Sequence, residues 1–277
     1  MIWQEGIEPT ATQAVSDVEV CCGGDALKPI ETAGPTCLAA QDLAHLENQK
    51  VFFGHQSVGD DIVHGIRDLM ASDPRLKLHI VESADPQQVP GPAFVETHIG
   101  RNGDPQSKAE AFRTIMDRGM GKEGGIALYK YCYVDVGPAT DIQKMFDEYR
   151  HGVDSLKLKY PLLRIVHVTI PLTTVEPAIK VWVKSALGRV TARDINRKRD
   201  AYNQLLAQAY CGEPIFDLAE IESTCRDGLR SESSVSRRQV PALNPKLTTD
   251  GGHLNESGRR TAARHLLLVL AKLGAGT

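Results

Sequence analysis

Short apolar runs alternate with segments of helical periodicity along most of the chain, and this alternation strongly limits the possible folds. Such a pattern is typical of a parallel sheet covered by helices on both faces, with the functional site at the carboxyl ends of the strands. We therefore predict a three-layer α/β/α sandwich with a central, mainly parallel sheet. The expected strands are 51–54, 78–82, 94–98, 126–133, 163–170 and 215–218, and the expected helices are about 59–71, 105–118, 140–157, 191–210 and 256–273.

The first 47 residues show no sustained periodicity apart from a short helical pattern near 41–46. We interpret residues 1–47 as an N-terminal arm and residues 48–277 as a single α/β domain. A chain of 277 residues with 42% apolar content is large enough to bury one core of good size.

Charge and hydropathy exclude some partners. A formal net charge of −3 gives no electrostatic attraction to nucleic acid or to an anionic membrane. The chain has no apolar run of about 18 residues, so no membrane span is expected. As written it lacks a secretory leader and is expected to be cytoplasmic; a secreted or periplasmic protein whose leader has been removed is also compatible.

The six cysteines show no Cys-x-x-Cys spacing, which argues against a thioredoxin-like motif or a tetrathiolate zinc site. Cys132 follows an apolar run and is expected to be a small buried residue. Cys211 and Cys225 could form a disulfide around the strand at 215–218, but free thiols are an open alternative. The remaining cysteines are Cys21, Cys22 and Cys37.

The chain ends with a carboxylate three residues before an imidazole, in Asp250-Gly251-Gly252-His253, just ahead of the last helical pattern. An Asp and a His that meet at a tight turn can serve a distant nucleophile. The Asp orients the ring and stabilises the imidazolium that forms during proton transfer. The pattern therefore predicts a nucleophile elsewhere in the chain.

Ser57 is the candidate nucleophile, because it lies where the first apolar run ends and the first helical pattern begins. A serine there would sit at a helix N-terminus, whose free N–H groups can stabilise an oxyanion. Serine is also a common helix N-cap, so a purely structural role is the competing interpretation.

These motifs resemble those of the SGNH or GDSL hydrolases over roughly residues 50–274. Gly54-His55-Gln56-Ser57 corresponds to the family's Gly-Asp-Ser block without its acidic residue, and the stretch 98–104 resembles its second block, with Gly100 at the oxyanion-hole glycine. Asp250-x-x-His253 fits the closing block. In the third block Val134 replaces the expected Asn, whose donor role could pass to Asn102 or to the Tyr133 hydroxyl.

The resemblance implies a flavodoxin-like sandwich and a serine esterase that acts on a small-molecule or carbohydrate ester. Ser57, His253 and Asp250 would form the catalytic triad and an acyl-enzyme, while Ser57, Gly100 and Asn102 would form the oxyanion hole. No metal or organic cofactor is expected. His55, Gln56 and Tyr133 are further candidates, either for contacts that support the triad or for contacts with the substrate.

Two other functions stay open at this point. The altered blocks are compatible with a catalytically silent domain that binds a glycan or a protein, and the same chemistry would serve an O-acyltransferase. The sequence contains no phosphate-binding loop, no Gly-x-Ser-x-Gly elbow and no His-Glu-x-x-His zinc motif.

Three further features are compatible with structural roles or with roles in substrate access. His167 lies within an apolar run and is expected to be a core histidine. Two insertions, 174–199 and 222–246, could shape substrate access. The first is rich in cations that form either a solvated face or a contact for an acidic substrate: Lys180, Lys184, Arg189, Arg193, Arg197, Lys198 and Arg199.

Overall fold

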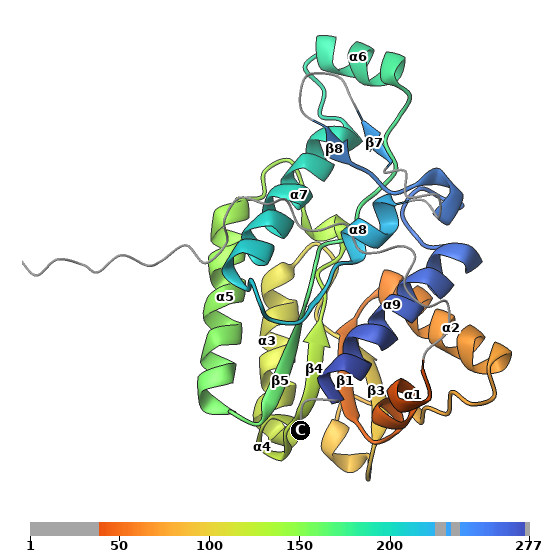
Figure 1. Ribbon diagram of the computed structural model, residues 1–277. Helices are drawn as coiled ribbons and strands as arrows, with labels where there is room; N and C mark the ends of the chain where they lie inside the picture. The colour runs from red at the N-terminus through yellow and green to blue at the C-terminus, as the bar shows by residue number, and fades with distance from the viewer. Residues whose placement is uncertain (1–38, 225–230, 234–238, 275–277) are drawn as a thin grey trace, which may run out of the picture.

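The computed structural model describes residues 39–224, 231–233 and 239–274, and its centre is a six-stranded sheet (Figure 1). The strand order is β2-β3-β1-β4-β5-β6, and every pairing within this sheet is parallel. The predicted α/β class with a parallel sheet is therefore confirmed. The strands are β1 (Lys50–His55), β2 (Ile80–Glu82), β3 (Ala93–His98), β4 (Gly125–Tyr129), β5 (Leu163–Val168) and β6 (Ile215–Phe216).

Helices cover both faces of the sheet and complete the three layers. One face packs against α1 (Ala40–Glu47), α2 (Ser57–Ser72), α8 (Leu218–Ser223) and α9 (Glu256–Gly274). The other packs against α3 (Pro105–Ile115), α5 (Ile142–Lys159) and α7 (Ala192–Ala209). The short α4 (Gly121–Glu123) precedes β4, and α6 (Ala178–Ala186) lies between β5 and α7.

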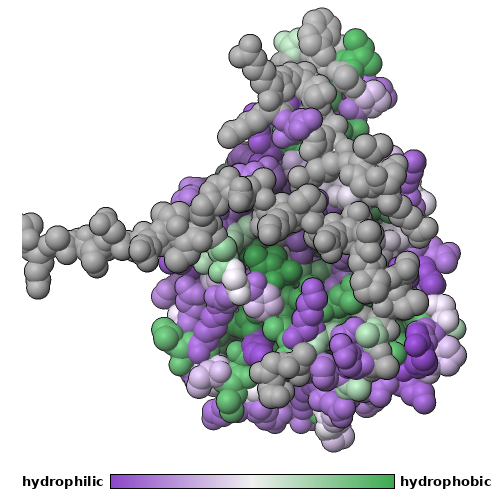
Figure 2. Space-filling model, viewed as in Figure 1, coloured by the Kyte–Doolittle hydropathy of each residue, from purple (hydrophilic) through white to green (hydrophobic). Residues whose placement is uncertain are grey.

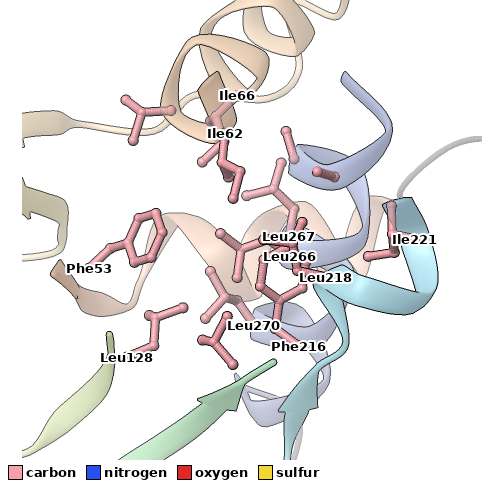
Figure 3. Packing of buried hydrophobic residues seen from close by; sticks show 14 of the residues in the cluster. Phe53, Ile62, Ile66, Leu128, Phe216, Leu218, Ile221, Leu266, Leu267 and Leu270 are labelled. Carbon is pink, nitrogen blue, oxygen red and sulfur yellow. The ribbon is translucent and has the colours of Figure 1, made fainter. Parts of the chain in front are cut away.

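Successive side chains of each strand point to opposite faces, so the central strands contribute to both cores. Phe53 packs with Ile62 and Ile66 of α2 and with Leu266 and Leu270 of α9 (Figure 3). Phe52, its neighbour in β1, packs on the other face with Phe112 of α3. Burial on both faces explains why these strands are continuous apolar runs rather than alternating ones.

The strand order places a topological switch point at β1, whose neighbours β3 and β4 lead to opposite halves of the sheet. Ligands of open α/β sheets bind outside the carboxyl ends of the strands at such a point. The segments that leave β1, β3 and β4 here begin at residues 56, 99 and 130. These segments contain the nucleophile turn and the second and third motif blocks.

Several predicted boundaries were wrong. The strand expected at 126–133 ends at Tyr129, and Tyr133 lies instead in a short 3-10 helix, η3 (Tyr133–Asp135). The reason is that the Asp135 carboxylate accepts a hydrogen bond from the Cys132 N–H at 2.7 Å, which closes a turn that the apolar pattern does not reveal. The helix expected at 105–118 ends at Ile115 and continues as a π-helix, η2 (Met116–Met120).

The two predicted insertions contain regular structure. The first holds α6 and the beginning of α7, and the second contains β7 (Glu232–Ser233) and β8 (Val240–Pro241), which pair antiparallel. Figure 2 shows hydrophobic surface at the top of the view, where Figure 1 places α6. Exposed side chains at and after α6 include Ile179, Leu187 and Val190.

Part of the predicted arm lies outside the described residues, as do Cys21, Cys22, Cys37 and Cys225. Within the described part, α1 confirms the short helix expected near 41–46. Cys132 is a buried free thiol, as predicted, and Cys211 is disulfide-bonded. Among the described helices, none has both the length and the apolarity that a membrane crossing requires.

Candidate active site

Ser57 is the first residue of α2, immediately after the turn that follows β1. Gln56 occupies the N-cap position, so the interpretation of Ser57 as the cap is wrong. The first N–H groups of a helix have no partner within it and carry partial positive charge. The hydroxyl of Ser57 therefore lies beside donors that could hold a developing negative charge.

The Asp-His turn is held by its own hydrogen bonds. One Asp250 oxygen, Oδ1, accepts from the backbone N–H groups of Gly252 and His253 at 2.9 and 2.8 Å. Gly251 has φ +90°, a region that favours glycine, and a Cβ there would lie 2.6 Å from the Thr174 hydroxyl. Hydrogen bonds within the turn therefore shape it locally, the Thr174 N–H donates to the Gly251 carbonyl at 2.9 Å, and the segment after β5 leaves room only for glycine at position 251.

The fold brings this turn to Ser57. The Ser57 Oγ lies 3.1 Å from Nε2 of His253, and the Nδ1 of that ring lies 2.5 Å from Oδ2 of Asp250. These hydrogen bonds fix the neutral tautomer: Nδ1–H donates to the carboxylate and Nε2 accepts from the hydroxyl. The three side chains meet the geometric requirement for a nucleophile, a general base and an orienting carboxylate.

Hydrogen bonding also sets the charge of the site. The bond from the His253 ring, together with the backbone N–H bonds of His253 and Gly252, holds the pKa of Asp250 well below its usual range. The side chains of His253 and Asp250 are 40% and 54% exposed, so the site opens to solvent. An ionised carboxylate behind an accessible imidazole favours the imidazolium that forms when His253 takes a proton.

A second carboxylate, that of Asp61, connects the Asp-His turn to α2. Asp61 of α2 accepts a hydrogen bond from the Leu254 N–H at 2.9 Å, and burial raises the pKa of this carboxyl. The contact fixes the position of the turn relative to Ser57. Sequence reasoning missed Asp61, because an acidic residue in the first turns of a helix is ordinary.

Gly100 lies in the loop after β3 and has φ +58°. A Cβ at this position would come within 2.5 Å of the Lys108 backbone nitrogen, so only glycine fits. The side-chain amide of Gln56 donates to the carbonyls of Ile99 and Gly100 at 3.0 and 3.2 Å. Gln56 therefore joins the nucleophile turn to the loop that carries Gly100, which is a positioning contact.

A buried ion pair anchors the remaining loops. The Lys108 ammonium contacts the Asp135 carboxylate at 2.5 Å, and both side chains are fully buried. Asp135 also accepts from the Gly103 N–H at 2.8 Å, while Lys108 donates to Oδ1 of Asn102 at 3.2 Å. Because Lys only donates, the amide oxygen of Asn102 must face it, and the exposed Asn102 keeps its NH₂ group as a donor.

Sequence reasoning did not identify Lys108, since a lysine in a helical pattern is normally a solvated residue. Asp135 did have a signal in the sequence. It directly follows Val134, and the third block of the family that the chain resembles has an Asp directly after its Asn. Val134 is 46% exposed and offers no donor there.

Tyr133 packs beside the histidine of the site. Its ring meets that of His253 edge to face, with centroids 5.9 Å apart, and burial raises the pKa of its hydroxyl. Arg199, which is buried, donates to the Tyr133 carbonyl through Nε and one terminal nitrogen at 3.1 and 2.9 Å. Arg199 therefore holds the backbone at Tyr133 in place beside His253.

Other cations of the first insertion also have partners. Lys198 donates to the carbonyls of Pro138 and Thr140, Lys184 pairs with Glu176, and Arg197 lies 3.6 Å from Asp194. These contacts indicate that the cations of the first insertion stabilise the protein itself, and they speak against a role in binding an acidic substrate.

Two other histidines are fully buried and have other partners than Ser57. His167 is fully buried in β5 between the Tyr149 hydroxyl and Glu213, and it is a core histidine as predicted. His55, two residues before Ser57, is also fully buried, and its Nε2 lies 3.1 Å from Glu96.

No protein-family model matches this chain, and no curated protein matches it in sequence. Solved structures that it resembles include a putative platelet activating factor from Streptococcus pneumonia, with 16% identity, a TM-score of 0.47 and coverage of 83% of this chain and 91% of that one. Another is a carbohydrate esterase family 3 protein from Talaromyces cellulolyticus, with 14% identity, a TM-score of 0.49 and coverage of 83% and 99%. A putative lipolytic protein of the G-D-S-L family from Desulfitobacterium hafniense has 8% identity, a TM-score of 0.46 and coverage of 80% and 99%. Identities this low say nothing about activity, so function is argued from the geometry of the site.

Proposed function

We propose that this protein is a serine esterase of the SGNH/GDSL type, which hydrolyses a carboxylic ester through an acyl-enzyme. The observation that carries the proposal is the chain of contacts from Ser57 Oγ to His253 Nε2, at 3.1 Å, and from His253 Nδ1 to Asp250, at 2.5 Å. A hydroxyl, an imidazole and an ionised carboxylate in this order activate serine in many unrelated folds.

In the first step His253 takes the proton of the Ser57 hydroxyl as its Oγ attacks the ester carbonyl, and the C=O electron pair moves onto oxygen. When the tetrahedral intermediate collapses, the proton passes from His253 to the departing alcohol, which leaves the acyl group on Ser57. Water then attacks this ester while His253 takes one of its protons. The bond between the acyl carbon and Ser57 Oγ breaks, His253 returns the proton to Oγ, and the carboxylic acid is released.

Three donors would stabilise the oxyanion. The N–H groups of Ser57 and Gly100 have no hydrogen-bond acceptor among the described residues, and both lie at the carboxyl end of the sheet. The third donor is assigned to the side-chain amide of Asn102, because Lys108 holds its oxygen and leaves the NH₂ group to donate. Asn102 would thus replace the donor that is missing at Val134.

The exposure of His253 and Asp250 supports a substrate with a large alcohol portion, such as a carbohydrate that carries an acetyl or other small acyl group. Because these side chains are open to solvent, a bulky alcohol portion could extend away from the site and would need no deep pocket to enclose it. An O-acyltransferase would use the same acyl-enzyme and differ only in preferring a sugar or alcohol hydroxyl to water.

The test is hydrolysis of p-nitrophenyl acetate by the wild type and by Ser57→Ala. The matched control is Ser72→Ala, at the other end of α2, which should retain wild-type turnover. A fluorophosphonate should label the wild type at Ser57 and leave Ser57→Ala unlabelled. Equal rates for the wild type and Ser57→Ala, without labelling, would instead support the silent binding domain, and faster acyl transfer to an added alcohol would support the acyltransferase.

A further inference from the structure

A cluster of two imidazoles and a carboxylate lies near the nucleophile turn but outside the proposed triad. His55 and His98 are the last residues of β1 and β3 and are direct partners in the parallel ladder, and Asp60 lies in the first turn of α2. One nitrogen of each ring and one Asp60 oxygen all lie within 4.8 Å of one another. Three side chains of the types that bind transition metals therefore converge on one point.

The distances within the cluster suit a single ion. His98 Nε2 lies 2.8 Å from Oδ1 of Asp60, and His55 Nδ1 lies 3.7 Å from the same oxygen. Ligand atoms of a tetrahedral zinc ion, each ~2.0–2.1 Å from the metal, are about 3.3 Å apart. The two distances to Asp60 fall on both sides of this value, and all three ligand atoms lie within 4.8 Å of one another. His98 and Asp60 are 55% and 38% exposed, so their side chains are free to rotate toward the ideal spacing.

The contacts of His55 give a second, independent indication. Its Nε2 lies 3.1 Å from the buried carboxylate of Glu96, and Arg67 lies 3.5 Å from the other Glu96 oxygen. If Nε2–H donates to Glu96, Nδ1 is left with a lone pair, which faces the Gln56 carbonyl at 3.3 Å as well as Asp60. Acceptor atoms that face one another repel, and either a proton on Nδ1 or a bound cation removes that repulsion. A carboxylate behind a ligating histidine is also the usual outer partner in zinc sites.

We propose that His55, Asp60 and His98 bind one first-row divalent cation of the zinc type, with Glu96 as the positioning residue for His55. Two imidazole nitrogens and one carboxylate oxygen form a zinc-type ligand set that leaves a fourth position for water or an anionic ligand at the surface. The site is separate from the esterase mechanism, which passes no proton or electron pair through it.

Isothermal titration of the full-length, tag-free protein with zinc sulfate, after removal of metal by a chelator, tests the proposal. The wild type should bind zinc at this site, and zinc should raise the midpoint of thermal unfolding. His98→Ala and Asp60→Asn should each lose this binding and the thermal shift. Glu96→Gln should lower the affinity by about 10–100-fold, the effect typical of an outer partner.

The matched control is His64→Ala, because His64 is exposed on the same helix, one turn beyond Asp60, and belongs to no ligand cluster of the described residues. It should bind zinc like the wild type. Ser57→Ala should do so as well, which separates the failure of this proposal from the failure of the esterase proposal. The metal site is refuted if zinc gives no thermal shift, or if His98→Ala, folded by circular dichroism, keeps the wild-type affinity.

Discussion

His253 and His167 have the same kinds of partners and yet belong to different parts of the molecule. Each ring lies between a carboxylate and a hydroxyl: Asp250 and Ser57 for His253, Glu213 and Tyr149 for His167. His253 lies at the carboxyl end of the sheet with 40% of its side chain exposed, whereas His167 is fully buried in β5. The comparison shows that a histidine with the same two kinds of partner can lie at an open edge of the sheet or deep in the core.

Burial decides the charge of His167. Its ring stacks on Tyr210, with centroids 3.7 Å apart, and burial lowers the pKa of His167 to about 4. The ring is therefore neutral near pH 7, with Nε2–H donating to Glu213 and Nδ1 accepting from Tyr149. The described residues close the ring off from solvent, and its hydroxyl partner Tyr149 lies in the middle of α5 rather than at a helix N-terminus.

The largest effect is expected for Asp250→Asn, which replaces the carboxylate that fixes the His253 tautomer. Turnover of p-nitrophenyl acetate should fall about 10⁴-fold while the protein stays folded. Glu213→Gln, the corresponding change beside His167, is the control and should leave turnover unchanged. Comparable losses in both variants would break the distinction between the two histidines.

The next largest effect concerns the hydrogen-bond donors proposed for the oxyanion, which have no counterpart in the proposal for His167. Asn102→Ala should lower kcat by about 10²–10³-fold with little change in KM, because an oxyanion donor acts mainly in the transition state. Tyr133→Phe is the matched comparison, since the Tyr133 hydroxyl is the rival donor. Loss of kcat in Tyr133→Phe but not in Asn102→Ala would reassign the third donor.

Around His167 the expected effect is on stability instead. Tyr149→Phe leaves the buried Nδ1 of His167 without a partner, which should cost about 1–3 kcal/mol in the free energy of unfolding. Urea denaturation measures this loss, and esterase turnover should stay at the wild-type value. Tyr160→Phe, which loses a less buried hydrogen bond to Asp117, should cost less.

The pH dependence gives the most gradual effect, spread over several pH units. The pKa of His167 is about 4 in the folded protein, below its ordinary value of 6.5, so the unfolded chain takes up a proton first as the pH falls. Stability from the neutral ring is complete above pH 6.5 and declines between pH 6.5 and 4, by about 1 kcal/mol per pH unit. His167→Gln should show a flatter decline in urea denaturation between pH 6.5 and 5; an unchanged slope would contradict the assignment.

Much of the site could be predicted from the sequence because its motifs are local. The Asp250–His253 spacing, the turn after the first apolar run and the glycine at position 100 each describe a few neighbouring residues. Lys108, Asp61 and Arg199 could not be found in this way. Their contacts are with residues 27, 193 and 66 positions away, and an isolated charged residue in a helical pattern does not indicate its partner.

The sequence by itself determined the layers of the sandwich and the shape of the Asp-His turn, because strand and helix periodicity and hydrogen bonds within three residues are local properties. The tertiary structure decided which histidine meets Ser57. Ser57 and His253 are 196 residues apart, and they meet because β1 lies between β3 and β4 while α9 packs against α2. Strand order and helix packing depend on the whole core, which local periodicity does not encode.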